Sequence, residues 1–424
     1  MKIGLSLGWI FPITLLGFVM VSVEYFNAVS TTATRWVPLA CLSAFLFYRG
    51  KLFLALRIPP APLLLAWVVW ATLTTLWSDV PVLSGMKSVA TIATVLAMTS
   101  GGIYWARYVR PDMPLSYLAP IAAISLFAGI AGFGVFHQTN AGLHVLRGLS
   151  TNPNILGHLL ASSLPYPLFA SYRAYAREPK KALRWIGWGV AALIVAILLV
   201  LTGSRGAALC AICIIGAFAA AVLSARVWMC MGLVALIAAS VCIVMPAEFS
   251  GGLRPAAQFI TKGHTGLLHS RERVWQTSFE HAIKGGGLGL GLGVSANGGN
   301  FEGGLSATEY GREKGNSQLA IAEETGLIGL TIYLVLLGSL FYCLLQGMAV
   351  AENREMRLQL LLLIGALGGL VAESVFEAWW TSPSSPESIL FWAAVGVAFG
   401  VRYQPRPGAA PPAPSSQEIP QSAS

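Results

Sequence analysis

Long apolar stretches alternate with short polar ones along almost the whole chain. Apolar runs long enough to cross a bilayer begin at about twelve positions, near residues 7, 33, 61, 86, 116, 154, 184, 206, 227, 317, 357 and 387. Lipid offers no hydrogen-bond partner to the backbone, so each run is expected to be a helix. The pattern therefore predicts an all-α polytopic membrane protein with about twelve transmembrane helices.

The composition rules out an ordinary soluble protein. The 424 residues are 55% hydrophobic and only 11% charged, and the mean hydropathy is +0.68. The first apolar run, GLSLGWIFPITLLGFVMVSVEYF, lacks the small-residue cleavage site of a signal peptide. We therefore interpret it as the first membrane span.

The basic residues follow alternate loops. If Lys2 is cytoplasmic, the loops on its side contain most of the 27 Lys and Arg residues, namely Arg49, Lys51, Arg57, Arg107, Arg110, Arg173, Arg177, Lys180, Lys181, Arg184, Arg226, Arg354, Arg357, Arg402 and Arg406. This asymmetry predicts that both termini are cytoplasmic. Topology then explains the net charge of +9, and no nucleic-acid partner is expected because the charge forms no basic domain.

One long loop divides the chain. Residues 1–247 are expected to form transmembrane helices 1 to 9, and residues 248–316 a large outer loop between helices 9 and 10. Residues 317–402 are expected to form helices 10 to 12, and the Pro-, Ala- and Ser-rich residues 403–424 a disordered cytoplasmic tail. Function in helical membrane proteins tends to lie in such a loop.

Within the loop, the segment SRERVWQTSFEHAIKGG is predicted to be an amphipathic helix. One stripe of this helix contains Val274, Trp275, Ser278, Phe279, Ala282 and Ile283. At about 100° per residue, Arg271 projects along the same stripe. The next segment, KGGGLGLGLG, lacks the strand and the spacing of a dinucleotide-binding loop, so its glycines predict a close-packed turn and a mobile lid.

Two arginines on the outer side are candidates for binding an anion. Arg205 lies in TGSRGA, at a tight outer hairpin, and Arg271 lies on the stripe of the amphipathic helix. The guanidinium group stays charged and binds phosphate through two nitrogens. An anionic ligand that enters from the outer leaflet, such as a lipid diphosphate, would account for both residues. Snorkelling to the membrane interface is the alternative for Arg205.

The tenth apolar run begins with polar groups. Asn316 and Glu323 lie on one helical face, and Glu324 lies about 80° round from Asn316. We predict Asn316, Glu323 and Glu324 as catalytic residues, with an interfacial polar belt as the alternative. Glu373 and Glu377, one turn apart in the eleventh run, leave the same two interpretations open.

The remaining polar residues suggest no further chemistry. Each histidine, His158 and His281 included, is interpreted as an ordinary solvated side chain. The six cysteines all lie in apolar runs, which indicates neither a disulfide framework nor a metal site. We expect no metal and no cofactor.

Five segments, in this order, resemble the bacterial O-antigen ligase and O-antigen polymerase superfamily of multispan glycosyltransferases. They are LWSDVPVLSG (76–85), TNPNILGHLL (151–160), TGSRGA (202–207), SRERVW (270–275) and NSQLAIAEETGLIGL (316–330). The resemblance implies a GT-C-like bundle in the bacterial inner membrane, and metal-independent, inverting transfer of a glycan from undecaprenyl diphosphate at the periplasmic face. It assigns diphosphate binding to Arg205 and Arg271.

The chain departs from the family pattern at one position. The family usually has a histidine, as base or acceptor-orienting group, immediately before the asparagine, and here that position is Gly315. The residues considered as substitutes are Glu309, Glu313, Glu323, Glu324, His264 and His281.

The expected function is that of an O-antigen ligase, with lipid A-core as acceptor and membrane lipids around the bundle. A polymerase that joins lipid-linked repeat units of O-antigen or exopolysaccharide is the alternative. A flippase or transporter of lipid-linked glycans is a third possibility. It predicts ionisable residues near the bilayer midplane, whereas the charges of this chain lie at the outer ends of the spans.

Overall fold

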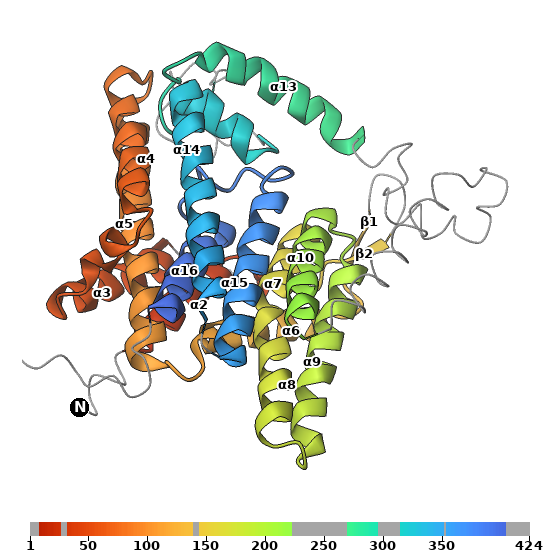
Figure 1. Ribbon diagram of the computed structural model, residues 1–424. Coiled ribbons are helices and arrows are strands. Elements are labelled where there is room, and N and C mark those ends of the chain that lie inside the picture. Colours follow the sequence, from red (N-terminus) through yellow and green to blue (C-terminus); the bar gives the residue numbers. More distant parts are fainter. Residues whose placement is uncertain are drawn as a thin grey trace, which may run out of the picture.

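A computed structural model describes residues 8–26, 32–138, 144–222, 269–295, 314–351 and 353–403. Helices account for most of these residues and form one bundle (Figure 1). They cover every expected apolar run except the ninth, near residue 227, which lies outside the described residues, as does the expected tail. The helical class is thereby confirmed, while the total of about twelve spans stays a prediction.

Within each described range, the elements follow one another with short connections. The longer helices before the outer loop are α2 (Ile10–Met20), α3 (Thr32–Tyr48), α4 (Ala61–Leu73), α5 (Pro81–Tyr104), α6 (Ala119–Ala131), α7 (Pro153–Ser163), α8 (Pro165–Arg177), α9 (Ala182–Leu201) and α10 (Arg205–Val222). Helix α13 (His269–Gly285) lies within the loop, and α14 (Ser317–Ala349), α15 (Arg354–Glu373) and α16 (Pro386–Arg402) follow it. Short helical segments are η1 (Glu24–Phe26), η2 (Leu52–Arg57), η3 (Thr74–Trp77), η4 (Trp105–Val109) and η5 (Pro114–Leu118).

Six helices in the described part of the chain are long and apolar enough to cross a membrane, by length and composition. They are α5 continued by η4, η5 continued by α6, α9, α10, α14 and α15. This confirms a multi-pass membrane protein.

The centre of the bundle is the C-terminal helix α16. Nearly all of its side chains between Ser388 and Val401 are buried, because the helix is apolar on all sides. It packs closely against α5: a Cβ atom added at Gly102 would lie only 2.6 Å from the carbonyl oxygen of Ala393. Small residues at such crossings allow two backbones to approach within van der Waals contact.

Polar contacts connect the basic loops at one end of the bundle. Arg107 donates to the carbonyl of Tyr403 (2.6 Å), and Arg177 donates to both carboxylate oxygens of Glu355 (2.9 and 2.8 Å). Arg354 donates to the carbonyl of Val222 (3.2 Å). The loops that the charge pattern assigns to one side therefore do lie together; that this side is the cytoplasm stays a prediction.

A small hairpin lies between α6 and α7. Strands β1 (Phe136–Gln138) and β2 (His144–Leu146) pair in antiparallel register, with His137 opposite Val145. Next to β2, Arg147 forms an ion pair with Glu24 (2.9 Å). This pair connects the start of the chain to the segment that precedes α7.

Helix α13 passes over the end of the bundle at which α14 begins (Figure 1). Its predicted stripe is divided. Trp275 donates to the carbonyl of Gly315 (3.0 Å) and Ser278 donates to that of Lys314 (2.5 Å), whereas the side chains of Phe279 and Ile283 are 57% and 64% exposed. The face of the helix that meets the protein is partly polar because its side chains donate hydrogen bonds to backbone carbonyls there.

Helix α14 is broken at Gly326. This residue has φ 70° and ψ −176°, a conformation essentially restricted to glycine. The break interrupts the intrahelical hydrogen bonds around it, and the glycine-rich segment after α13 replaces them. Leu290 and Gly291 donate to the carbonyls of Glu323 and Glu324 (both 3.0 Å).

The same segment also accepts hydrogen bonds. Leu327 donates to the carbonyl of Gly286 (3.0 Å) and Ile328 to that of Gly287 (3.3 Å). A Cβ atom at Gly326 would collide with the carbonyl of Gly287. The glycines thus form the close-packed turn that the sequence predicts; a mobile lid stays a prediction.

Replacing Gly326 with Ala should lower the stability of the protein. Alanine is strained at this φ and ψ and has no room for its Cβ, so we expect a loss of about 1–3 kcal/mol. Thermal unfolding in detergent measures the change. The control is Gly338→Ala in the same helix, where an added Cβ meets nothing within 4 Å. Equal melting temperatures for the two variants would contradict the strain at Gly326.

Candidate active site

The N-termini of three helices surround a pair of polar pockets. One pocket, of about 30 Å³, is lined by Asn154, His158, Ser204, Arg205, Gly206, Phe376 and Glu377. The other, of about 320 Å³, is lined by Asn152, Asn154, Ile155, His158, Glu377, Ala378, Trp379, Ser382, Ser385 and Glu387. Residues of α7, α10 and the connection from α15 to α16 therefore meet at one place, with the first turn of α16.

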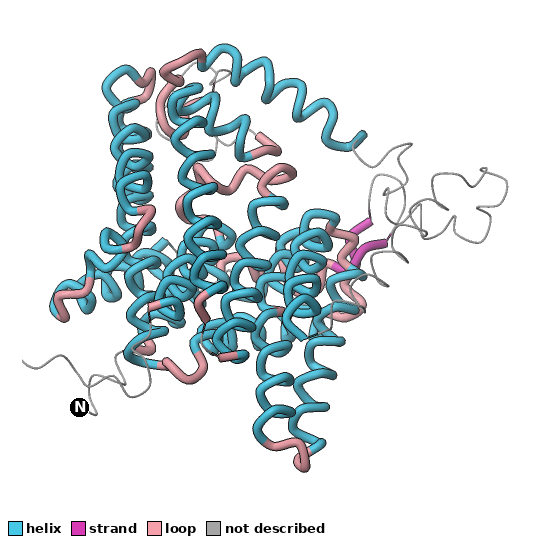
Figure 2. Tube along the Cα trace, in the orientation of Figure 1, coloured by secondary structure: helices cyan, strands magenta, loops and turns pink. Residues whose placement is uncertain are grey.

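A fourth helix N-terminus holds the connection between α15 and α16 in position (Figure 2). The buried hydroxyl of Ser317 donates to the carbonyl of Glu377 (2.9 Å) and accepts from the amides of Trp379 (3.1 Å) and Trp380 (3.3 Å). Its own amide donates to the carbonyl of Ser374 (2.7 Å). The start of α14 thereby fixes the segment that brings Glu377 into both pockets.

Asn316 takes part in the same arrangement. Its carboxamide oxygen accepts from the amide of Leu319 (2.9 Å), which caps α14, and its nitrogen donates to the carbonyl of Val375 (3.1 Å). Gln318 donates to the hydroxyl of Ser374 (2.8 Å). Asn316, Ser317 and Gln318 therefore position the neighbouring connection. A catalytic role for Asn316 stays a prediction.

His158 lies one helical turn after Asn154 on α7. Its side chain is 5% exposed, and Nδ1 lies 2.8 Å from Oε1 of Glu373, whose side chain is fully buried. The interpretation of His158 as a solvated side chain is therefore wrong. A buried carboxylate needs a cationic or hydrogen-bonding partner, and the imidazole of His158 provides it.

The lining of the pockets carries both positive and negative charge. Helices α7, α10 and α16 direct the positive ends of their dipoles toward this place, and Arg205 adds a full positive charge. Glu377 and Glu387 contribute carboxylates, and the amide of Asn154 lies 3.5 Å from Oε1 of Glu377. Such a site can bind an anion beside groups that hydrogen-bond to hydroxyls.

The carboxylates of Glu323 and Glu324 lie in a second polar cluster and are buried. Lys314 contacts both, at 3.3 Å from Oε2 of Glu323 and 2.5 Å from Oε1 of Glu324. Glu324 also accepts from the amide of Gly293 (2.6 Å) and the hydroxyl of Thr381 (3.0 Å). These contacts connect both flanks of the outer loop to α14.

Glu323 has further partners within the outer loop, on α13 and on the glycine-rich segment that follows it. The hydroxyl of Ser295 donates to Oε1 (3.3 Å), and Nδ1 of His281 lies 3.5 Å from the same oxygen. His281 is buried, so its interpretation as a solvated residue is wrong as well. Catalysis by Glu323 or Glu324 stays a prediction; the contacts show that both residues hold the loop flanks.

Several sequence candidates lie beyond what the structure describes. Arg271 lies in the first turns of α13, but its side chain is outside the described part, so its approach to Arg205 stays a prediction. Glu309, Glu313 and His264 also lie outside the described residues. Within the described ranges, no group of three or more His, Cys, Asp and Glu is placed to hold a metal ion.

Sequence reasoning missed His158 and left Glu373 and Glu377 open as interfacial residues. The available signal was spacing: His158 follows Asn154 by four residues, as Glu377 follows Glu373. Spacing places each pair on one helical face but does not show that the two faces meet. Only the packing of α10 against both α7 and α15 does so.

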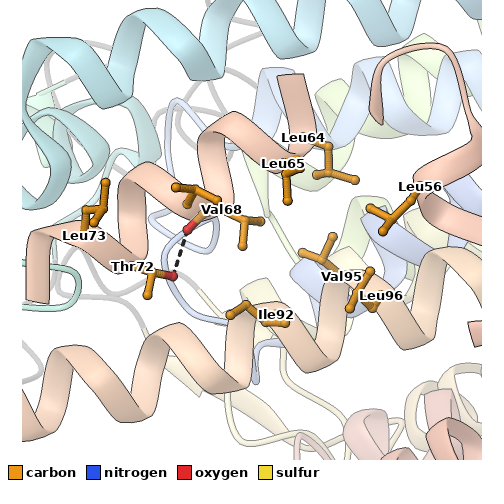
Figure 3. Close-up of a pocket in the computed structure, with 10 residues that line it drawn as sticks. Leu56, Leu64, Leu65, Val68, Thr72, Leu73, Ile92, Val95 and Leu96 are labelled. Atoms are coloured by element: carbon orange, nitrogen blue, oxygen red, sulfur yellow. Dashed lines mark hydrogen bonds between the residues drawn. The ribbon is translucent and has the colours of Figure 1, made fainter. Parts of the chain in front are cut away.

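A separate apolar groove of about 310 Å³ lies between α4 and α5 (Figure 3). Its only polar side chain is Thr72, whose hydroxyl donates to the carbonyl of Val68 in the same helix (2.8 Å). The groove can hold hydrocarbon, but its lining offers no group for a chemical step.

The fold and the pockets define a class of protein. It is a multi-pass membrane protein with an arginine, a histidine and carboxylates in polar pockets at the N-terminal ends of its helices. Residues 190–334 match the family model described as O-Antigen ligase. This range includes Arg205, the outer loop and the start of α14. This match confirms the resemblance to the O-antigen ligase and polymerase superfamily and indicates a glycosyltransferase-type enzyme. No curated protein matches the chain.

Removing the cation of the second cluster should destabilise the protein. In Lys314→Met, Glu323 and Glu324 remain buried and lose the cation that contacts both of them, so we expect a loss of about 3–5 kcal/mol. The lowered melting temperature in detergent measures this loss. Adding Glu324→Gln should restore part of it, because one uncompensated charge is then removed.

Lys284→Met is the matched control, since Lys284 is an exposed lysine in the last turn of α13. This variant loses the same charge but leaves no buried carboxylate unpaired. A melting temperature of Lys314→Met as high as that of Lys284→Met would show that the cluster does not hold the loop flanks.

Proposed function

We propose that the protein transfers a glycan from undecaprenyl diphosphate to a hydroxyl of an acceptor sugar, at the periplasmic face of the bacterial inner membrane. The observation that carries this proposal is the position of Arg205. It lines a polar pocket together with Asn154 and Glu377, while the start of α14 holds the connection that bears Glu377. Three of the family-like segments thus contribute to one place.

The donor diphosphate is assigned to the Arg205 side of the pockets. The guanidinium of Arg205 can pair with phosphate oxygens, and the N-termini of α7 and α10 add their amide dipoles. When the sugar leaves, negative charge grows on the bridging oxygen of the diphosphate. A cation fixed beside that oxygen favours the transition state over the ground state. Arg271 is proposed as the second cation.

The acceptor sugar is assigned to the larger pocket. Its volume of about 320 Å³ is of the order of one or two sugar rings, and Asn152, Asn154, Glu377 and Glu387 line it. Carboxylates and carboxamides both hydrogen-bond to sugar hydroxyls. Trp379 contributes an apolar wall. The transfer is proposed to invert the anomeric centre and to need no metal ion.

Among the acceptors, lipid A-core is our first proposal, which makes the protein an O-antigen ligase. The dominant late outer loop, residues 248–316, favours it. Polymerisation of lipid-linked repeat units is the second candidate, and Gly315 in place of the family histidine favours it.

A transport function has less support. The buried charged and titratable residues of the described part lie on α7, on α13, around the start of α14 and at the end of α15, rather than halfway along the long spans; they are His158, His281, Lys314, Glu323, Glu324 and Glu373. The cytoplasmic position of both termini, the lipid surroundings and the absence of a nucleic-acid partner belong to the same proposal.

Loss of the Arg205 guanidinium should abolish transfer. In Arg205→Ala we expect a drop of about 100-fold or more in glycan transfer, because the leaving diphosphate loses its cation. Arg205→Lys should recover only part of the rate, since an ammonium group cannot pair bidentately. Transfer is measured in a complementation assay, with membrane expression quantified in parallel.

Arg147→Ala is the matched control, because Arg147 lies on the β-hairpin side of α7 and pairs with Glu24 rather than lining either pocket. It should transfer glycan like the wild type. Wild-type transfer by Arg205→Ala would refute the assignment of the diphosphate site.

A strain that lacks the protein should show which acceptor is used. Loss of a ligase leaves unattached polymer on the lipid carrier, whereas loss of a polymerase leaves single repeat units. Gel analysis of lipopolysaccharide and of lipid-linked glycan distinguishes the two products. We expect unattached polymer; single repeat units would move the assignment to polymerase.

A further inference from the structure

The transfer proposed above needs a proton acceptor, and the family histidine is replaced by Gly315. We infer that His158, oriented by Glu373, is the general base that takes the proton from the acceptor hydroxyl. This inference rests on the proposed function and supplies the residue that the sequence leaves unassigned.

The orientation of the imidazole is fixed from one side. Nδ1 of His158 is 2.8 Å from Oε1 of Glu373, and the carboxylate of Glu373 has 0% exposure. The structure gives Nε2 no partner among the described residues, and His158 lines both polar pockets. Nε2 is therefore the nitrogen available to a hydroxyl bound there. A carboxylate that holds one imidazole nitrogen also stabilises the imidazolium formed when the other accepts a proton.

The local packing leaves little freedom to this pair. A Cβ atom at Gly206 would lie 3.1 Å from Cγ of Glu373 and 3.5 Å from Cε1 of His158. Glycine at the second position of α10 therefore allows the backbone to lie directly against both side chains. The Ser-Arg-Gly segment thus contributes the proposed diphosphate cation and, in its glycine, the space for the His158–Glu373 pair.

The position of His158 relative to Arg205 suits the reaction. Both residues line the small pocket, which shares His158, Asn154 and Glu377 with the larger one. An acceptor hydroxyl between the two pockets would have the base on its own side and the diphosphate cation beyond the sugar carbon. This is the order that an in-line displacement requires.

Other bases are less well placed. Glu323 and Glu324 are engaged by Lys314, and neither lines the two pockets. Glu377 lines both, but its carboxylate oxygen Oε1 already accepts from the side-chain nitrogen of Asn154 (3.5 Å). Glu377 is better suited to hold the acceptor sugar through its hydroxyls.

The step balances without a co-reactant. The proton of the acceptor O–H passes to Nε2 of His158 while the oxygen lone pair forms a bond to the anomeric carbon. The bond from that carbon to the diphosphate oxygen breaks, and its electron pair stays on undecaprenyl diphosphate beside Arg205. The imidazolium then returns its proton to the diphosphate or to water.

The charged and titratable groups that surround His158 come from several elements. Glu373 is at the end of α15, Glu377 follows it, Glu387 is in the first turn of α16, and Arg205 is on α10. Cys210, also on α10, lies near Glu373. Only the unprotonated imidazole can act as a base. The rate should therefore fall as the pH decreases and the His158–Glu373 pair takes up a proton.

The test uses the full-length protein in proteoliposomes, with an undecaprenyl-diphosphate-linked glycan as donor and lipid A-core as acceptor, both from the organism that makes the protein. His158→Ala and His158→Gln should lower kcat by about 100- to 10,000-fold, with the KM for the donor little changed. Added imidazole should restore part of the rate in His158→Ala. Glu373→Gln, which alters a positioning residue, should lower kcat less.

The matched control is His144→Ala, because His144 is an exposed histidine on the β-hairpin that lines neither pocket. It should keep the wild-type kcat. The wild-type enzyme should lose rate at acidic pH, whereas the residual rate of His158→Ala should no longer show this acidic limb. Monodispersity in detergent shows that each variant is folded.

The outcomes separate the inference from the proposed function. Wild-type kcat in a folded His158→Ala, with Arg205→Ala inactive, overturns the base assignment and leaves the function in place. A wild-type protein that transfers no glycan from the lipid diphosphate overturns the function itself. If both His158 variants misfold, the wild-type pH profile decides: a constant rate between about pH 5 and 8 overturns the inference.

Discussion

The structure depends on one requirement: polar groups that enter an apolar bundle must find their partners inside the protein. Ser317 is the clearest example of a side chain that satisfies this requirement. Its hydroxyl bonds to the backbone at Glu377, Trp379 and Trp380, a segment that would otherwise leave its amides and carbonyls unpaired. The connection between α15 and α16 is irregular, and irregular backbone at this depth is stable only when such contacts satisfy it. The pockets that contain Arg205 and His158 exist because this connection is held.

The same requirement divides the buried charges into two groups with different roles. Around Lys314, the carboxylates of Glu323 and Glu324 have several partners each, and the contacts run to both flanks of the outer loop. Around His158, the carboxylate of Glu373 has one close partner, and that partner lines the pockets. Groups with several partners each are held in place, whereas an imidazole that lines a pocket can exchange a proton with a molecule bound there.

The broken helix α14 couples the two groups. Because Gly326 interrupts the helix, the carbonyls of Glu323 and Glu324 accept from Leu290 and Gly291 instead of from the following turn. The glycine-rich segment, although distant in sequence, therefore provides hydrogen bonds that an unbroken helix would form within itself. The glycine-rich segment of the outer loop therefore packs against the broken part of α14. The first turns of α14 contact this segment and also the connection that carries Glu377.

The amino-acid sequence by itself determined the helical membrane class, the places of the described helices, α13 among them, and the resemblance to the O-antigen ligase family, because apolar length and short motifs are local properties. It also singled out Arg205, whose position in a pocket only the structure shows. It misjudged His158 and His281, which it treated as solvated, since burial depends on which helices pack together. The pairing of His158 with Glu373, and of Lys314 with Glu323 and Glu324, was decided by tertiary structure alone. Residues far apart in the chain become partners there because a buried charge must be compensated wherever the packing of the helices places it.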